Sequence, residues 1–159
     1  MSKPIDSVDF WKERIDTAQK EQYSVYVTGE HDWRRIFEAH RRTISEVIPE
    51  GSSVLDAGCG YGRMSELFDT EKYVGIDFSP DFVRKSMENY PGNVFYRMNM
   101  KKLDFEDGEF DWAICVSIRK MVQDNLGDAE WLRMLAELKR VAGKVLVLEY
   151  EDPEPFEIL

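Results

Sequence analysis

Val54-Leu55-Asp56-Ala57-Gly58-Cys59-Gly60-Tyr61-Gly62-Arg63 is the most informative segment of this chain. A short apolar run ends in an acid and is followed by three glycines at alternate positions. Residues 63–68 then resemble a helix start, so the pattern predicts a strand, a tight turn and the first turns of a helix. Glycines in such a turn accept backbone angles that a Cβ disfavours, and they let a ligand lie against the main chain. Free N–H groups and the positive end of the helix dipole favour a nucleotide-like ligand there.

The spacing of the glycines distinguishes between kinds of nucleotide site. In the dinucleotide-binding fingerprint the third glycine comes three positions after the second, whereas Gly62 comes two positions after Gly60, and Arg63 stands at the fingerprint position. No Gly-Lys-Ser/Thr follows, which argues against a P-loop. A second apolar segment, residues 72–77, ends in Asp77, 21 residues after Asp56. An acid at that distance is placed to accept hydrogen bonds from two ribose hydroxyls.

These motifs resemble those of the small, single-domain class I (Rossmann-like) methyltransferases that depend on S-adenosylmethionine (SAM). The glycine turn resembles the family's first motif, and Ile76-Asp77-Phe78-Ser79-Pro80 resembles the motif whose acid binds the ribose. Asn99 stands where the family has an acid that accepts from the adenine amino group, and an amide can also accept there. The resemblance implies SAM as cofactor, S-adenosylhomocysteine (SAH) as product and no metal. It implies cofactor-binding roles for Asp56, Gly58, Gly60, Gly62, Arg63, Asp77, Phe78, Asn99, Met100 and Ser117.

The 159 residues predict one domain. The resemblance implies the α/β class, with a doubly wound, mostly parallel sheet in the order 3-2-1-4-5 and helices on both faces. Residues 1–49 predict a cap of two helices, at 7–22 and 32–48, joined by a loop at 22–29. Residues 50–150 form the expected SAM-binding core, and 151–159 an acidic tail. The core comprises strands ending near residues 57, 77, 98, 116 and 150, a helix that Ser79 and Pro80 begin, and a helix at 127–141 closed by Gly143.

The resemblance implies two further strands, in the order 3-2-1-4-5-7-6, which this chain lacks. The apolar strand expected at 144–150 would then be an exposed edge, and proteins normally cover or pair such edges. Two arrangements would cover it. Either the tail at 152–159 folds back over the edge, or a second copy of the chain pairs there and forms a homodimer.

Composition and charge indicate which binding partners and which cellular compartment to expect. The formal net charge is −10, and its sign makes nucleic acid an unlikely partner, because nonspecific binding needs a basic surface. The segment after the fourth strand, Ser117-Ile118-Arg119-Lys120, also lacks the Pro-containing motifs of the methyltransferases that act on nucleic-acid bases. No apolar run approaches the ~18 residues of a membrane span, and we expect no secretory leader at the N-terminus. Cys59 and Cys115 are expected to be reduced thiols, so the predicted location is cytoplasmic.

Three residues are candidates for catalysis, each with a structural alternative. His40 lies on the apolar side of its helix and is either a core histidine or a general base at the rim of the site. Tyr26 is either packing or a base, and aromatic groups near it could shield a sulfonium. Arg119 either binds an anionic substrate or caps the next helix. The four arginines at 34, 35, 41 and 42 stack on one side of a helix, as a solvated surface or as an anion site.

The expected activity is methyl transfer from SAM to a small-molecule or protein acceptor. The methyl group of SAM is already activated, so alignment is the main requirement and no fixed catalytic residue can be demanded. One alternative is a catalytically weak, methyltransferase-like module that binds SAM and serves a partner protein. A third reading is another nucleotide-using enzyme of Rossmann-like fold, such as a dehydrogenase or an aminopropyl transferase.

Overall fold

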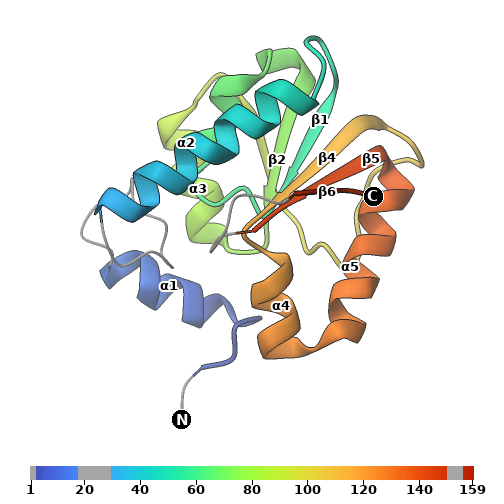
Figure 1. The fold of residues 1–159 in the computed structure, drawn as a ribbon. Helices are drawn as coiled ribbons and strands as arrows, with labels where there is room; N and C mark the ends of the chain where they lie inside the picture. The colour runs from blue at the N-terminus through green and yellow to red at the C-terminus, as the bar shows by residue number, and fades with distance from the viewer. Residues whose placement is uncertain (1–2, 18–29, 150–155) are drawn as a thin grey trace.

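The computed structural model describes residues 3–17, 30–149 and 156–159. A six-stranded sheet in the order β3-β2-β1-β4-β5-β6 forms its centre (Figure 1). The strands are β1 Val54–Ala57, β2 Tyr73–Asp77, β3 Val94–Arg97, β4 Phe110–Val116, β5 Ala142–Leu148 and β6 Glu157–Ile158. Strands β1 to β5 are parallel, and β6 runs antiparallel to β5. The α/β class and the order 3-2-1-4-5 are therefore confirmed.

Helices cover both faces of this sheet. They are α1 Val8–Thr17, α2 Glu30–Val47, α3 Pro80–Asn89, α4 Arg119–Leu126 and α5 Asp128–Val141, with short 3-10 helices η1 Arg63–Leu67 and η2 Thr70–Lys72. Figure 1 shows α2 crossing the sheet and α1 and α4 lying beyond the end of the central strands. None of the helices in the described part of the chain is long and apolar enough to span a bilayer.

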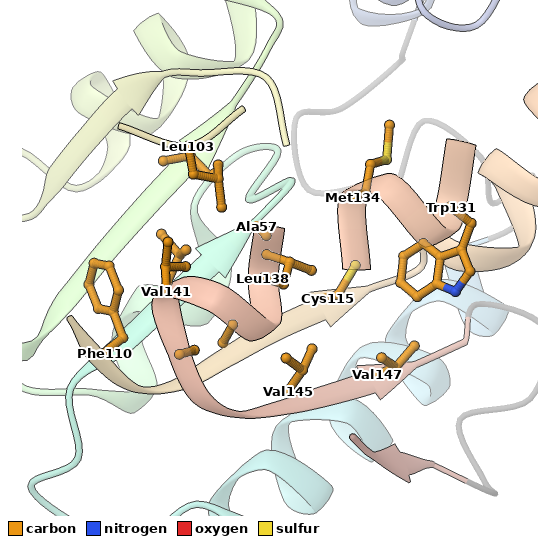
Figure 2. Close-up of a cluster of buried hydrophobic side chains, with 14 of the residues drawn as sticks. Ala57, Leu103, Phe110, Cys115, Trp131, Met134, Leu138, Val141, Val145 and Val147 are labelled. Atoms are coloured by element: carbon orange, nitrogen blue, oxygen red, sulfur yellow. The ribbon is translucent and has the colours of Figure 1, made fainter. Parts of the chain in front are cut away.

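The two-sided core explains the apolar run at residues 145–148 of β5. Val145 and Val147 pack with Leu138 and Trp131 of α5 on one face (Figure 2). Leu146 and Leu148 point the other way, into a cluster that includes Ile44 and Ile48 near the end of α2. Because both faces of the strand are buried there, each of the positions 145–148 favours an apolar side chain.

The N-terminal helices agree with the prediction where they can be compared. Helix α2 occupies almost the range expected, and its end precedes Pro49. Helix α1 lies within the predicted 7–22, but residues 18–29, including the predicted loop, are outside the described residues. In α3, the hydroxyl of Ser79 accepts a hydrogen bond from the N–H of Phe82, and Pro80 is the first helical residue, as expected.

Three local predictions need correction. The helix expected after the glycine turn is only the five-residue 3-10 helix η1, which begins after Gly62 without a side-chain cap and ends where Phe68 turns extended and stacks on Tyr73. Gly143 does not close α5 but lies in β5, where a Cβ would come 3.1 Å from the carbonyl oxygen of Asp111 on β4. The separate helix α4 was not predicted at all. Its end is marked by Gly127, whose φ of 92° favours glycine.

Of the two arrangements expected at the exposed edge of β5, the structure has the first. Leu146 and Val147 pair with Ile158 and Glu157 of β6. The backbones of Val145 and Leu159 exchange two further hydrogen bonds of 2.9 and 2.8 Å. The C-terminal residues thus cover part of this edge, and a second copy of the chain is not needed for that purpose.

Candidate active site

A cleft of about 190 Å³ lies at the carboxyl ends of β1 to β4. The turns that follow these four strands line it, together with residues of the five α-helices and of the segment before α1. In open α/β sheets this end, beside the point where strand order reverses, is where ligands bind. Nine of the ten predicted cofactor-binding residues line the cleft: Asp56, Gly58, Gly60, Arg63, Asp77, Phe78, Asn99, Met100 and Ser117.

The tenth, Gly62, has a structural role beneath the cleft. All three glycines of the turn have positive φ, between 54° and 80°. A Cβ on Gly62 would lie 2.8 Å from the ring of Phe95, and one on Gly58 would lie 2.7 Å from Ile118. A Cβ on Gly60 would meet no atom within 4 Å, so this glycine presents open main chain. Of the three glycines, Gly60 therefore leaves the most room for close approach to the main chain.

The turn uses several of its own N–H groups. Those of Gly58 and Cys59 donate to the carbonyl of Ile76 at 2.8 and 2.9 Å, and that of Gly62 donates to Cys59 at 2.9 Å. With only a short 3-10 helix behind it, the turn also lacks the dipole that a long α-helix would provide. The expected role of the turn as a set of free donors is thus replaced by a simpler one, which is a bare surface for close approach.

Asp77 joins the end of β2 to this turn. Its carboxylate accepts from the N–H of Gly60 at 3.1 Å and from the N–H of Ser79 at 2.9 Å. A carboxylate has about four acceptor positions, so both oxygens can accept further hydrogen bonds from a ligand. Burial raises the pKa of Asp77 to about 6, although its backbone hydrogen bonds oppose the shift. An acid held this way fits the hydroxyl pair of a ribose.

Asp56 is the second buried acid. It accepts a 2.6 Å hydrogen bond from the hydroxyl of Tyr73, and burial raises its pKa to about 7, with repulsion from Asp77 adding to the rise. The charge of Arg63, which also lines the cleft, acts in the opposite direction. Asp56 and the guanidinium of Arg63 at one end of the cleft suit the ammonium and carboxylate groups of an amino-acid ligand.

The turns after β3 and β4 supply the remaining predicted residues. The side-chain oxygen of Asn99 accepts from the N–H of Lys101 at 2.9 Å, which fixes the orientation of the amide. The amide NH₂ can therefore donate to a ring nitrogen. Ser117 has a φ of 61° although it is not glycine, and its N–H donates to the carbonyl of Leu148 at 2.8 Å. Strain of this kind clusters at functional sites.

The three predicted catalytic residues differ in where they lie relative to the cleft. His40 lines the cleft, and its Nε2 lies 2.8 Å from the backbone oxygen of Glu149. Arg119 begins α4 and forms ion pairs with Glu149 and Glu157 rather than lining the cleft. Tyr26 lies outside the described residues, so its role stays a prediction.

Sequence reasoning missed two groups of residues. Trp11 of α1 lines the cleft, donates from its indole N–H to the carbonyl of Ile5 at 2.7 Å, and lies edge-on to Phe78 with ring centroids 6.5 Å apart. No local pattern indicated that α1 reaches β2. Glu149, which holds both His40 and Arg119, did carry a signal, since it is an acid at the end of an apolar strand like Asp56 and Asp77.

The sequence of this chain is similar to those of known proteins. Residues 54–144 match the family model described as a methyltransferase domain. A 2-methyl-6-phytyl-1,4-hydroquinone methyltransferase of Synechocystis is 32% identical over 77 residues, which are 43% of this chain and 24% of that protein. A phthiotriol/phenolphthiotriol dimycocerosates methyltransferase of Mycobacterium leprae is 25% identical over 122 residues, which are 73% of this chain and 43% of that protein. The chain thus spans less than half the length of these curated relatives.

Solved structures share the fold. A protein of Pyrococcus horikoshii is 25% identical with a TM-score of 0.64, and the match covers 81% of this chain and 62% of that one. A SAM-dependent methyltransferase of Methanosarcina mazei is 23% identical with a TM-score of 0.55, covering 66% of this chain and 55% of that one.

Proposed function

The chain belongs to the methyltransferase-domain family, whose cofactor is SAM, and we propose that it transfers the methyl group of SAM to a small-molecule acceptor. The observation that carries the proposal is the cleft itself. It joins the open main chain at Gly60 to two buried acids and an oriented amide. These groups match the amino-acid, ribose and adenine parts of one ligand.

The order of the strands suggests how the cofactor lies. Asp77 ends β2 and would accept from the ribose hydroxyls, while Asn99 and Met100, after β3, would contact the adenine. Gly60, after β1, would then face the amino-acid end, with Arg63 near its carboxylate and Asp56 near its ammonium group. Gly58 and Gly62 keep the turn in the shape that this requires. Phe78 would pack against the adenosine, and Ser117 would border the methyl-bearing end.

The other requirements of methyl transfer have to be met by the protein's own side chains. When bound, SAM supplies a methyl group that is already activated on a sulfonium. The protein has to align an acceptor with it, exclude water and, where the acceptor carries a proton, accept that proton. His40 is our candidate for the proton acceptor. Arg119 is our candidate for a positioning residue, because its ion pairs hold Glu149 and hence the oxygen that His40 contacts.

A small molecule is favoured as acceptor over a protein side chain. Two of the relatives are named for a phytyl-substituted hydroquinone and for phthiotriol dimycocerosates, which are small molecules. The helices α1, α2 and α4 surround the cleft, so the acceptor has to enter between them. A compact or slender molecule meets this requirement better than a folded protein surface.

Calorimetry with SAM, SAH and NAD tests the cofactor assignment, with Asp77→Asn as the variant. We expect SAM and SAH to bind, NAD not to bind, and Asp77→Asn to weaken SAH binding by about 10- to 100-fold, since hydrogen bonds to a charged group are lost. Asp104→Asn, at an exposed acid after β3 outside the cleft, is the matched control and should leave the affinity unchanged. Tighter binding of NAD than of SAH would refute the assignment. Methyl transfer to a metabolite panel would separate an enzyme from a SAM-binding module.

A further inference from the structure

The part of the cleft nearest α2 differs from the cofactor end. Ile36 and Phe37 of α2, Met64 of η1 and Val116 at the end of β4 line it, together with His40. We call these five residues the α2 subsite. If the adenosine lies over β2 and β3 and the amino-acid end over β1, the methyl group is directed toward β4 and this subsite. The inference therefore rests on the proposed function.

Apolar side chains dominate the α2 subsite. Ile36 and Met64 are each only 8% exposed, and Phe37 and Val116 pack against the core cluster beneath α2. The guanidinium of Arg63 lies 5.0 Å from the centre of the Phe37 ring, and that of Arg41 lies 5.3 Å from it. These contacts hold the ring in place. A flat apolar molecule would replace water on this surface favourably.

The cations around the subsite already have anionic partners within the protein. Arg41 pairs with Glu66 at 2.8 Å, and Arg119 pairs with both Glu149 and Glu157. Arg63 faces the amino-acid end, where we assign it to the cofactor carboxylate. Among the described residues around the subsite, an anionic acceptor would thus find no counter-charge reserved for it, and such burial is costly. Of the acids that line the cleft, Asp56 and Asp77 lie at the cofactor end and Asp6 precedes α1, so none of the three belongs to the α2 subsite, which disfavours a cationic acceptor as well.

His40 adds one polar atom to this apolar surface. The backbone oxygen of Glu149 can only accept, so Nε2 of His40 must carry the hydrogen that bridges the 2.8 Å between them. In neutral His40, Nδ1 is then the nitrogen with a lone pair. Burial and the charge of Arg63 lower the pKa of His40, while the backbone oxygen and the carboxylate of Glu149 oppose that shift. The ring is therefore held as a neutral proton acceptor.

We propose that the α2 subsite binds a neutral, apolar acceptor with a phenol-type hydroxyl, and that Nδ1 of His40 takes the hydroxyl proton. The acceptor oxygen bonds to the methyl carbon as its proton moves to Nδ1, and the electron pair of the broken carbon–sulfur bond stays on sulfur. A neutral acceptor and a cationic SAM thus give a neutral methyl ether, neutral SAH and a protonated His40. A phenol, with a pKa of about 10 like that of tyrosine, suits an imidazole base far better than an alkyl alcohol does.

Nuclear magnetic resonance of the wild-type chain tests the histidine without any activity assay. Nitrogen shifts of His40 should report a neutral ring with hydrogen on Nε2 at pH 7. Addition of 2-naphthol to the SAH-saturated chain should shift the Nδ1 resonance. Hydrogen on Nδ1 instead, or a charged ring at pH 7, would overturn the assignment of the base.

Calorimetry on the same SAH complex tests the acceptor class with three probes of similar shape. We expect 2-naphthol to bind at least about tenfold more tightly than 2-naphthoate or 2-naphthylmethylammonium, because the charged groups lose hydration without gaining a partner. His40→Gln keeps a donor for the oxygen of Glu149 but lacks Nδ1, so it should retain SAH binding and bind 2-naphthol more weakly. Leu132→Ala, on the exposed side of α5, is the matched control.

The outcomes separate the two proposals. If SAH binds but the carboxylate or the ammonium probe binds as tightly as 2-naphthol, the acceptor class is wrong and the cofactor assignment stands. If SAH does not bind, the proposed function fails and the acceptor proposal fails with it.

Discussion

Asp56 and Asp77 end neighbouring parallel strands, and both carboxyl groups are buried beside the glycine turn. Their pKa values rise to about 7 and about 6, because burial disfavours the charged form. Without a ligand, the ionised acids therefore cost the folded state free energy. The cationic ammonium and sulfonium of SAM would relieve this cost, so the same two residues connect folding stability to cofactor binding.

The first prediction concerns Asp56→Asn. An acid whose pKa is raised in the folded state contributes most stability below its unfolded pKa of 3.8, and that contribution is lost as the pH rises to about 7. The full loss is on the order of 4 kcal/mol above pH 7. An amide does not titrate and still accepts from the Tyr73 hydroxyl. We therefore expect the variant to gain stability over wild type as the pH rises from 5 to 8, by on the order of 2 kcal/mol.

Urea unfolding of both ligand-free chains at pH 5 and pH 8 measures this difference. Glu137, whose pKa falls to about 2 beside Arg140, titrates with the opposite sign, but it is present in both chains and cancels. A stability difference that does not change between pH 5 and pH 8 would show that Asp56 titrates normally in the folded state.

At this scale the sequence predicts a residue's role well when a local pattern repeats. Asp56 and Asp77 could be recognised because each ends an apolar run and the two lie 21 residues apart in the sequence. Glu149 fits the same pattern but escaped notice, because its contacts come from α2 and α4, which are far away in the sequence. The positive φ of Ser117 was equally hidden, since nothing in the local sequence calls for glycine there.

At the scale of elements, the glycine turn and η1 act as a unit between β1 and β2. At Gly62 and Gly58 a Cβ would collide with neighbouring side chains, whereas at Gly60 it would meet open space. The sequence showed three equivalent glycines and could not separate these roles, because the distinction depends on which side chains arrive from β3 and from the loop after β4. The length of η1 was also misjudged, since the stacking of Phe68 on Tyr73 ends the helix after five residues.

The second prediction compares Gly60→Ala with Gly62→Ala. Both place a Cβ on a residue with positive φ, which costs about 1–2 kcal/mol. At Gly62 the Cβ also meets the Phe95 ring at 2.8 Å, and overpacking adds about 1–3 kcal/mol. At Gly60 the Cβ enters open space in the cleft. We expect Gly62→Ala to lose more stability than Gly60→Ala. We expect Gly60→Ala to lose more SAH affinity than Gly62→Ala, although its loss of stability is modest.

Thermal unfolding and calorimetry with SAH, applied to both variants, check this pair. Gly108→Ala is a useful control, because Gly108 has a φ of 67° and open space around its Cβ position but lies far from the cleft in a loop before β4. It should reproduce the backbone strain alone. Equal SAH affinity in Gly60→Ala and Gly108→Ala would show that the cofactor does not bind against the glycine turn.

At the scale of the whole molecule, the sheet runs from β3 at one edge to β6 at the other. The order of the five parallel strands followed from the resemblance to the class I methyltransferases, and the apolar runs in the sequence mark where the strands lie. The sequence did not reveal that β6 pairs with the edge of β5, because two residues of an acidic tail carry almost no strand signal. Figure 1 shows β6 beside β5, where long-range pairing decided the outcome.

The last prediction concerns removal of residues 156–159. Their loss frees the backbone of residues 145–147, which now bonds to β6 and Leu159, and leaves a long apolar edge strand. Such edges pair with other chains. We expect the shortened chain to form dimers or larger species in size-exclusion chromatography with light scattering, at concentrations where the full chain keeps its own mass. Glu157→Gln removes only one ion pair to Arg119, partly exposed, and should behave like the full chain. An unchanged mass after truncation would mean that β6 does not protect this edge.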